Sequence, residues 1–214
     1  MRSTASAYLP KGVSPIKKVI EYMILSEVAD IIVGIPEEKP QNGQIYEYYC
    51  IQPSHLQEFN QMNVVDMIYR STVLSNSAFV KLNDILLKRL NPSNIYLLTR
   101  ECPNTFISAN MMIVRANDNI DAKYLASILE NQGLPSLQHN TTRGTAIQTI
   151  SKTELQNVKI PILPLEKQKN VGEIWLLGKE KQKLLKKLAD EETKHIKALI
   201  DQLMSDGGTK NGDN

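Results

Sequence analysis

The feature that most constrains the fold is the run of Lys, Leu and Glu that begins at Leu165. Apolar residues recur through this run at helical spacing with charged residues between them, which predicts one long amphipathic helix over residues 165–204. Pro164 suits the start of that helix, where a missing N–H costs nothing. Gly172 and Gly178 each weaken a helix by about 1 kcal/mol relative to alanine, which predicts a bent or frayed first half.

A helix of forty residues extends about 60 Å, which is longer than a small domain is wide. Its apolar stripe therefore cannot be buried along its whole length against the residues that precede it. Two arrangements remain open: the helix folds back on its own domain, or it packs antiparallel against a second copy or another protein. The residues predicted to form the partner-binding face are Leu185, Leu188, Ile196, Leu199 and Leu203.

The first 164 residues have the pattern of a compact, mostly β domain. Apolar and β-branched runs alternate with polar turns, which is typical of short strands joined by tight connections. The sequence therefore predicts an α+β chain: a domain over residues 1–164, a helix over 165–204 and a disordered tail over 205–214. The predicted strands are residues 30–34, 45–52, parts of 64–69 and 80–90, 95–99, 104–116 and 158–163.

Three short helices are predicted within this domain. Apolar residues at i, i+3, i+4, i+7 and i+8 spacing indicate a helix from Ser14 to Ile24. Asp121 opens a second amphipathic helix, which Gly133 and Pro135 are expected to end. Ser151-Lys-Thr-Glu154 has the spacing of a capping box and predicts a third, short helix.

Composition narrows the class of protein. The two cysteines, Cys50 and Cys102, fit neither a disulfide framework nor a zinc pattern, so both are expected to be reduced. No apolar stretch approaches the roughly 18–20 residues of a membrane span, and residues 1–15 lack the apolar core of a signal peptide. These features predict a cytoplasmic protein without a membrane partner.

No pattern of catalytic residues emerges. The three histidines are far apart, and the chain has no Walker loop, GxSxG elbow or GxGxxG turn. Asn91-Pro-Ser-Asn94 is weakly similar to the Asn-Pro-Pro-aromatic motif of amino-methyltransferases but lacks the aromatic that stacks on a flipped base. Glu192 and Lys194 imitate a nuclease ExK pair, yet residues two apart on a helix point to different sides. We therefore predict a non-enzymatic protein without cofactor or metal.

Four segments in order resemble the specificity (S) subunit of type I restriction–modification systems. "SEVADIIVG" (26–34) resembles the entry to its target recognition domain. "KLNDILLKRLNPSN" (81–94) resembles its Gly-Asp-Ile-Leu strand and turn, with Asn83 in place of the glycine. "FISANMMIVRANDNIDAKYLASIL" (106–129) resembles its strand–loop–helix. "TTRGTAIQTISKTELQNVKIPILP" (141–164) resembles its Gly-x-x-x-Gln loop, short helix and Ile-Pro-x-x-Pro close. The long helix follows, and the match spans roughly residues 24–204.

The resemblance implies a function in DNA recognition. Such subunits carry two recognition domains, each reading half of a split target, and two long helices that pair as a spacer and dock methyltransferase subunits. This chain has one domain and one helix. The resemblance therefore implies a half-length S subunit that forms a homodimer through its helix and binds double-stranded DNA. It also implies assembly with a methyltransferase subunit and, through it, a restriction subunit, in which catalysis belongs to those partners.

Base edges are read by Arg, Asn and Gln, whereas Lys, Arg and hydroxyl groups bind phosphates. Polar loops rich in these residues are the candidates for contact with DNA. The candidate residues are Thr141, Thr142 and Arg143 on one loop, Lys88, Arg89, Asn91 and Asn94 around a turn, and Lys39, Gln41 and Asn42, with Gln44, on a hairpin loop. Each group could equally be a solvated loop.

The charge leaves a second class of function open. The net charge is only +2, and a nucleic-acid-binding protein often has a clear basic excess. A structural adaptor that binds only proteins through a coiled-coil handle is therefore the alternative, and an unassembled remnant of a rearranged specificity gene is a third reading. Footprinting with the methyltransferase present would distinguish a specificity subunit from an adaptor.

Overall fold

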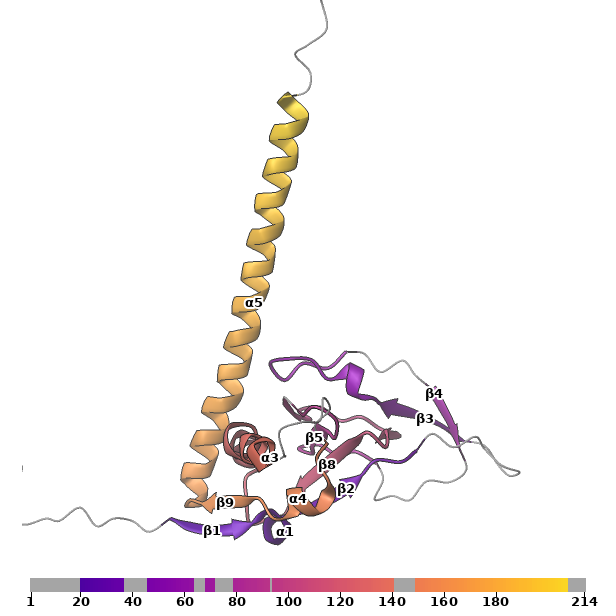
Figure 1. The fold of residues 1–214 in the computed structure, drawn as a ribbon, viewed down its shortest axis with the longest axis vertical. Helices are drawn as coiled ribbons and strands as arrows, with labels where there is room; N and C mark the ends of the chain where they lie inside the picture. Colours follow the sequence, from indigo (N-terminus) through magenta and orange to yellow (C-terminus); the bar gives the residue numbers. More distant parts are fainter. Residues whose placement is uncertain are drawn as a thin grey trace, which may run out of the picture.

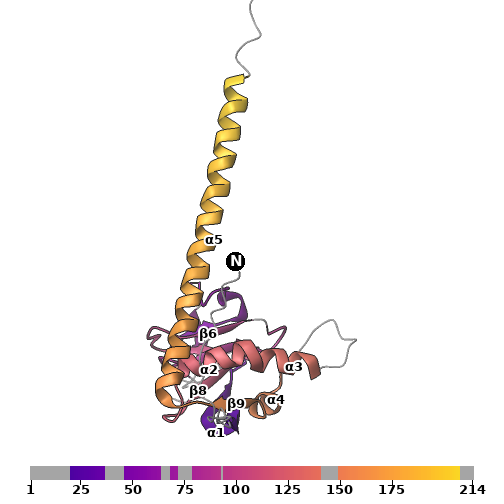
Figure 2. The same cartoon turned by 90° about the vertical axis from the view of Figure 1, so that its left-hand side faces the viewer.

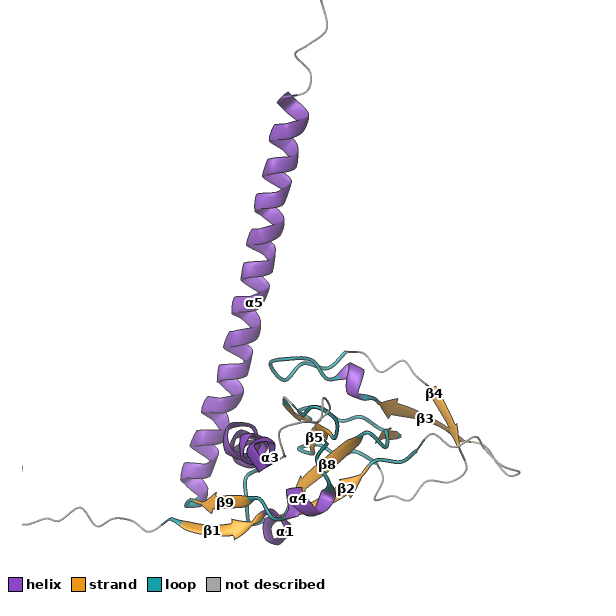
Figure 3. Cartoon of the chain, in the orientation of Figure 1, coloured by secondary structure: helices purple, strands orange, loops and turns teal. Residues whose placement is uncertain are grey.

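The computed structural model describes residues 20–36, 46–63, 68–71, 79–92, 94–140 and 149–207. A β-rich domain with short helices lies beside one end of a long helix, α5 (Leu165–Gly207), and the rest of α5 projects beyond the domain (Figures 1 and 3). The predicted α+β fold class with a long C-terminal helix is therefore confirmed.

A four-stranded antiparallel sheet with the strand order β2-β8-β5-β6 forms the centre of the domain. Its strands are β2 (Ala29–Val33), β8 (Met111–Ala116), β5 (Ile85–Lys88) and β6 (Ile95–Leu97). The two middle strands, β5 and β8, each begin with a continuous apolar run whose side chains are buried, Ile85–Leu87 and Met111–Val114. Such runs are the pattern of strands that are covered on both faces.

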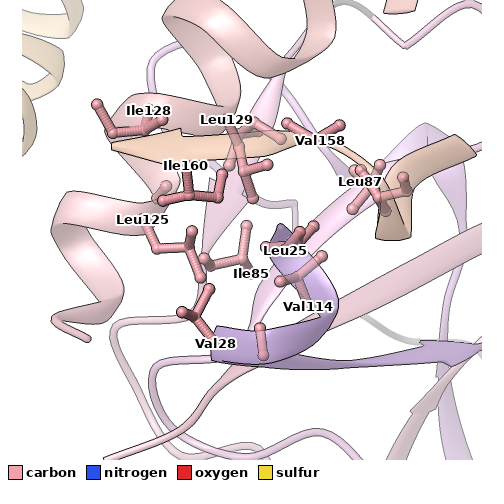
Figure 4. Close-up of a cluster of buried hydrophobic side chains, with 14 of the residues drawn as sticks. Leu25, Val28, Ile85, Leu87, Val114, Leu125, Ile128, Leu129, Val158 and Ile160 are labelled. Carbon is pink, nitrogen blue, oxygen red and sulfur yellow. The ribbon is translucent and has the colours of Figure 1, made fainter. Parts of the chain in front are cut away.

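Successive side chains of a strand point to opposite faces, so β5 divides the core into two clusters. Ile85 and Leu87 lie in the first cluster, whereas Leu86 lies in the second. Figure 4 shows Leu25, Leu125 and other side chains of the first cluster around Ile85. The elements that supply this cover include α1 (Leu25–Val28), α2 (Ala122–Ile128) and β9 (Lys159–Ile162).

A second sheet, with the order β4-β3-β7, supplies part of the cover for the other face. β3 (Tyr46–Ile51) pairs antiparallel with β4 (Ile68–Ser71) and parallel with β7 (Thr105–Ile107). Ile51 and Ile107 from this sheet join the second cluster. A short 3-10 helix, η1 (Pro53–His55), follows β3.

The single strand predicted over residues 104–116 is wrong, because the stretch forms two strands in different sheets. β7 and β8 are separated by a turn at Ser108–Asn110, where the Met111 amide donates to the Ser108 carbonyl at 2.9 Å. The small and polar residues of "SAN" interrupt the apolar run and favour a turn. This turn carries the chain from the second sheet into the first.

The helix predicted from Ser14 to Ile24 is wrong where the structure describes it. β1 (Glu21–Ile24) is a strand that pairs antiparallel with β9, with Met23 opposite Ile160. The remainder of the predicted helix, residues 14–19, lies outside the described residues. Tertiary pairing with β9 satisfies the backbone of β1 and overrides the local helical pattern.

The helix that opens at Asp121 is longer than predicted. The Asp121 carboxylate accepts from the Tyr124 amide at 2.8 Å and caps α2. The chain then continues through a π-type turn, η3 (Leu129–Gly133), into α3 (Leu134–Asn140), so the predicted end at Gly133 and Pro135 is wrong. In this turn the Leu134 amide donates to the Leu129 carbonyl. The wider turn admits Pro135, which cannot donate within a regular α-helix.

The capping box predicted at Ser151 is confirmed, and it begins α4 (Lys152–Gln156). The Ser151 hydroxyl accepts from the Glu154 amide at 3.2 Å, and the Ser151 amide donates to the Glu154 carboxylate at 2.8 Å. The Ser151 hydroxyl also donates to the Glu154 carboxylate at 2.6 Å, and this bond, together with the one from the Ser151 amide, lowers the pKa of Glu154. The box satisfies two backbone donors at the helix start.

The turn before β5 explains the position at which Asn83 replaces glycine. Asn83 has a φ of 68°, in the left-handed region that glycine and asparagine tolerate best. Asp84, which is 1% exposed, then binds the Arg115 guanidinium through both oxygens at 2.8 and 2.7 Å. That pairing raises the pKa of Arg115 and ties the start of β5 to β8.

The joint between domain and helix follows the predicted strand over residues 158–163, which is confirmed as β9. α5 begins at Leu165, and the Pro164 carbonyl accepts from the Lys167 and Gln168 amides at 2.8 and 3.1 Å. The Gln168 side chain, 2% exposed, donates to the Leu163 carbonyl and accepts from the Asp121 amide. The joint is thereby hydrogen-bonded to the start of α2.

The bend or fraying predicted in the first half of α5 is wrong, since α5 is one continuous and visibly straight helix (Figure 1). Gly172 lies where α5 crosses α2, and a Cβ there would approach the Lys123 Cβ to 2.6 Å and the Tyr124 amide nitrogen to 2.7 Å. A Cβ on Gly178 would have no neighbour within 4 Å. Gly172 is therefore required by close packing, whereas Gly178 is not.

The two glycines provide a matched test of this crossing. Gly172→Ala is expected to lower the free energy of unfolding by about 1–3 kcal/mol, because the added methyl group forces α5 from α2. Gly178→Ala is expected to raise it by up to about 1 kcal/mol through helix propensity alone. Urea denaturation followed by circular dichroism measures both, and equal effects of the two substitutions would contradict this account of the crossing.

Candidate nucleic-acid interface

The structure describes one of the three loop groups predicted to contact DNA. Lys88, Arg89, Asn91 and Asn94 lie in or beside the turn that joins β5 to β6. The other two groups, Thr141, Thr142 and Arg143, and Lys39, Gln41 and Asn42 with Gln44, lie outside the described residues. The β5–β6 turn and its neighbours are therefore the part of the candidate interface that the structure describes.

The β5–β6 turn presents side chains of different character. Lys88 ends β5 opposite Met111 and is half-buried. Asn91 is exposed and has a φ of 45°, and Asn94 is half-buried. Asparagine at a positive φ fits the turn chemistry that the sequence indicated here.

Arg89 is held by the neighbouring β7–β8 turn. Its guanidinium donates to the Ala109 carbonyl at 3.1 Å, and its amide donates to the Asn110 carbonyl at 2.9 Å. Its Nε is buried and has no hydrogen-bond partner among the described residues, which is also true of the nearby Ser108 hydroxyl. The Arg89 guanidinium, which the sequence suggested as a DNA-contacting group, therefore makes a structural contact with the β7–β8 turn.

The turn also meets the end of the segment that carries the first candidate group. Leu90 and Thr149 form an isolated antiparallel bridge, and the Ile150 amide donates to the Arg89 carbonyl at 2.9 Å. Thr149 follows residues 141–148 directly in the chain. The fold thus brings Thr149, the residue that follows the first candidate loop, into contact with the β5–β6 turn, which carries a second candidate group.

Asn110 is a further candidate that the sequence did not identify. It is exposed on the β7–β8 turn, and its backbone contacts Arg89. Its position was hidden because residues 104–116 were predicted as one strand, in which Asn110 would have been an internal residue. The side chains of Asn91, Asn94 and Asn110 give this end of the sheet several amide groups, which can donate to and accept from base edges.

α5 presents a second surface, which carries the predicted partner-binding residues. Leu185, Leu188, Ile196, Leu199 and Leu203 are each between 46 and 72% exposed. Ile174 and Leu177 continue the same side toward the domain and are 71 and 67% exposed. We call these seven residues the apolar stripe; at 100° per residue they fall within roughly 100° of the helix circumference.

The apolar stripe is separate from the face that α5 turns toward its own domain. That second face carries Gly172, Trp175 and Lys179. The Trp175 indole donates to the Glu130 carboxylate at 2.8 Å, and Lys179 pairs with the same carboxylate at 2.5 Å. Figure 2 shows α2 lying across the lower part of α5, with the upper part of α5 free of the domain. The domain therefore covers one side of α5 and leaves the apolar stripe open.

Within the described ranges, no group of three or more His, Cys, Asp or Glu is placed to hold a metal ion. The helices described, α5 included, are too polar or too short to cross a lipid bilayer.

Comparison with known proteins shows where this fold occurs. No family model matches the chain. The HsdS subunit from Thermoanaerobacter tengcongensis superposes with a TM-score of 0.54 at 21% identity, over 84% of this chain and 42% of that chain. A chain from a structure that describes complex assembly and conformational transition of the type I R-M system gives a TM-score of 0.62 at 19% identity, over 89% of this chain and 46% of the other.

A third solved structure is also similar to this chain. The type I restriction-modification system S subunit from M. genitalium gives a TM-score of 0.52 at 17% identity, over 84% of this chain and 44% of that chain. The chain thus spans less than half the length of each of these three chains. At these identities the similarity shows a shared fold, and the fold implied by the resemblance to S subunits is confirmed.

Substitutions at Asn91 can test the backbone conformation of this turn separately from the Asn91 side chain. Asn91→Gly is expected to leave the free energy of unfolding within about 0.5 kcal/mol of the parent, because glycine accepts a positive φ. Asn91→Val is expected to lower it by about 1–3 kcal/mol, because a β-branched residue is strained there. Thermal and chemical denaturation measure both, and equal stability of the two variants would contradict the assigned turn geometry.

Proposed function

We propose that this chain is a DNA-specificity subunit of a type I restriction–modification complex. In this proposal its domain reads one half of a split DNA target, and α5 both separates the half-sites and docks methyltransferase subunits. The observation that carries the proposal is the fold that it shares over more than four fifths of its length with S subunits from such systems. The protein itself is non-catalytic, and methylation and cleavage belong to its partners.

The β5–β6 and β7–β8 turns are the proposed DNA-reading surface among the described residues. Asn91, Asn94 and Asn110 carry amides of the kind that pair bidentately with adenine. Lys88 supplies a positive charge beside them for a phosphate. The loops that contain Thr141, Thr142 and Arg143 and that contain Lys39, Gln41 and Asn42 remain proposed contributors.

The apolar stripe is the proposed site of dimerisation. Two copies of α5 that pack antiparallel through their stripes would bury leucine and isoleucine side chains on both helices. A two-fold axis through the pair would place one reading domain at each end. The chain would then bind an interrupted palindrome, as a homodimer that recruits the methyltransferase subunit and, through it, the restriction subunit. Such a complex acts on chromosomal DNA, so we propose a cytoplasmic location.

A structural adaptor remains the second candidate function. The net charge of +2 over the whole chain favours it, because non-specific attraction to DNA would be weak. An adaptor would use the apolar stripe to join proteins and would protect no DNA.

Footprinting with the purified methyltransferase partner tests the central proposal. A specificity subunit is expected to protect two short segments separated by an unprotected spacer, whereas an adaptor protects none. Lys88→Gln is expected to weaken binding to all sequences alike and to reduce the slope of log K against log salt by about one. Asn91→Gly is expected to cost about 1–3 kcal/mol at one target base pair, with the turn preserved. Absence of protection in the full complex would refute the proposal.

Light scattering after size exclusion tests the dimer. The parent is expected to elute as a dimer at micromolar concentration, and Leu188→Asp is expected to yield a monomer, because a charge in a helix seam is costly to bury. Lys187→Asp is the matched control: it places the same residue one position away, roughly 140° from the middle of the apolar stripe, and should remain dimeric. A monomeric parent, with or without the methyltransferase, would contradict dimerisation.

A further inference from the structure

A loop of the domain contacts α5 well above its crossing with α2. The loop is residues His55–Asn63, which we call the hook. The contact on α5 is Lys186, two helical turns beyond Lys179. Lys186 lies on the domain-facing side of α5, since positions 172, 175, 179 and 186 follow helical spacing. The hook therefore meets a face of α5 that the apolar stripe does not use.

The hook is closed by its own backbone. Leu56 and Met62 form an antiparallel bridge, and the Gln57 amide donates to the Gln61 carbonyl at 2.8 Å. The base is closed by the Asn63 amide, which donates to the His55 carbonyl at 2.9 Å. Leu56 is buried in the second core cluster, and Met62 packs against the same cluster. The base of the hook is thus anchored in the core.

The tip of the hook is fixed by Asn60. Its side-chain oxygen accepts from the Leu97 amide at 2.7 Å, and its side-chain nitrogen donates to the Leu97 carbonyl at 3.1 Å. Two hydrogen bonds to one fully buried residue of β6 leave the tip little freedom to move. This anchor lies beside the residues that contact α5.

The backbone at the tip is held in an unusual conformation. Phe59 and Asn60 have φ values of 56° and 57°. Asparagine tolerates this region, but phenylalanine is strained there and persists only where the surroundings fix it. With this backbone the Phe59 ring and the neighbouring Glu58 side chain both reach Lys186 of α5, and Figure 1 shows this loop extending from the sheets toward the helix.

Lys186 contacts two neighbouring residues of the hook, Glu58 and Phe59. Its Nζ lies 3.2 Å from the Glu58 carboxylate and 5.8 Å from the centre of the Phe59 ring. The ion pair and the cation–π contact place one ammonium group between two partners. Because Lys186 and Glu58 are 56 and 60% exposed, each contact is weak alone, and the anchored tip makes the combination effective.

We propose that the hook holds α5 at a fixed inclination to the domain and thereby sets the separation of the two DNA half-sites. Phe59 and Lys186 are positioning residues in this assignment. The restraint on α5 follows from the contacts above, whereas the consequence for half-site spacing rests on the proposed function. The two parts can be tested separately.

The geometry of α5 enlarges any movement at Lys186. Lys186 lies about 21 Å along the helix from the crossing at Gly172, and Asp201 lies about 44 Å from it. A lateral shift of about 3 Å at Lys186 therefore becomes about 6 Å at Asp201. A shift of that size can be measured with spin labels.

The first experiment measures the inclination without DNA. Spin labels are placed on Lys152→Cys in α4 and Asp201→Cys in α5 of the full chain, with Cys102→Ser to remove a half-buried thiol. Labelled protein is diluted with unlabelled protein, so that only distances within one chain are recorded. Lys186→Glu, which sets two carboxylates together, is expected to broaden the distance distribution and to shift it by up to about 6 Å.

Three further variants separate this role from a general effect on folding. Lys187→Glu makes the same charge change one residue away and is expected to leave the distribution unchanged. Phe59→Gly removes the ring and the strain, so it is expected to broaden the distribution without loss of stability. Glu58→Lys with Lys186→Glu restores the opposite charges and should narrow it again. Unchanged distances in both Lys186→Glu and Phe59→Gly would overturn the proposal.

The second experiment measures half-site spacing in complex with the methyltransferase. DNA targets with spacers of different length compete for binding to the parent and to Lys186→Glu. The ratio of the affinity for the preferred spacer to the affinity for the other spacers is expected to fall toward one in the variant. Broadened distances with an unchanged spacer preference would overturn the link to spacing. If the parent binds no DNA, the proposed function fails while the label distances still decide the restraint.

Discussion

The crossing of α2 and α5 is the contact on which the rest of the structure depends. Gly172 lets the two helices approach closely, and Gln168 joins the start of α2 to the joint before α5. Since α2 also covers the central sheet, the helix that projects from the molecule is connected to the sheet core by a single layer of packing. At this crossing α5 is held by the same side chains that stabilise the domain, and Lys186 adds a second contact with the hook farther along the helix.

The sequence predicted those parts of the fold that depend on local chemistry. The long helix, the capping box at Ser151 and the strands β2, β5 and β6 of the central sheet follow from helical periodicity, caps and short apolar runs. Predictions failed where contacts between distant residues decide the outcome. β1 is a strand because β9 pairs with it, and Gly172 strengthens the packing of α5 because α2 crosses there. Pro135 is tolerated because the preceding turn is of the π type.

The candidate site was predictable only as a set of residue types. The sequence identified Lys88, Arg89, Asn91 and Asn94, but nothing in it could show that Arg89 contacts the β7–β8 turn or that Asn110 lies alongside. Those contacts join residues about twenty positions apart through the register of β5 and β8. The exposed apolar face of α5 was easier to predict, because a helix longer than its domain must leave part of its apolar face uncovered.

The side chain of Asn60 has a further consequence for the behaviour of the domain in a crowded cell. β6 is one of the two edge strands of the central sheet, and an open edge offers amides and carbonyls to any other extended chain. Asn60 occupies both backbone groups of Leu97, as a neighbouring strand would. One amide thus takes the place of an additional strand and guards this edge against aggregation, which matters for a protein whose long helix already exposes apolar side chains.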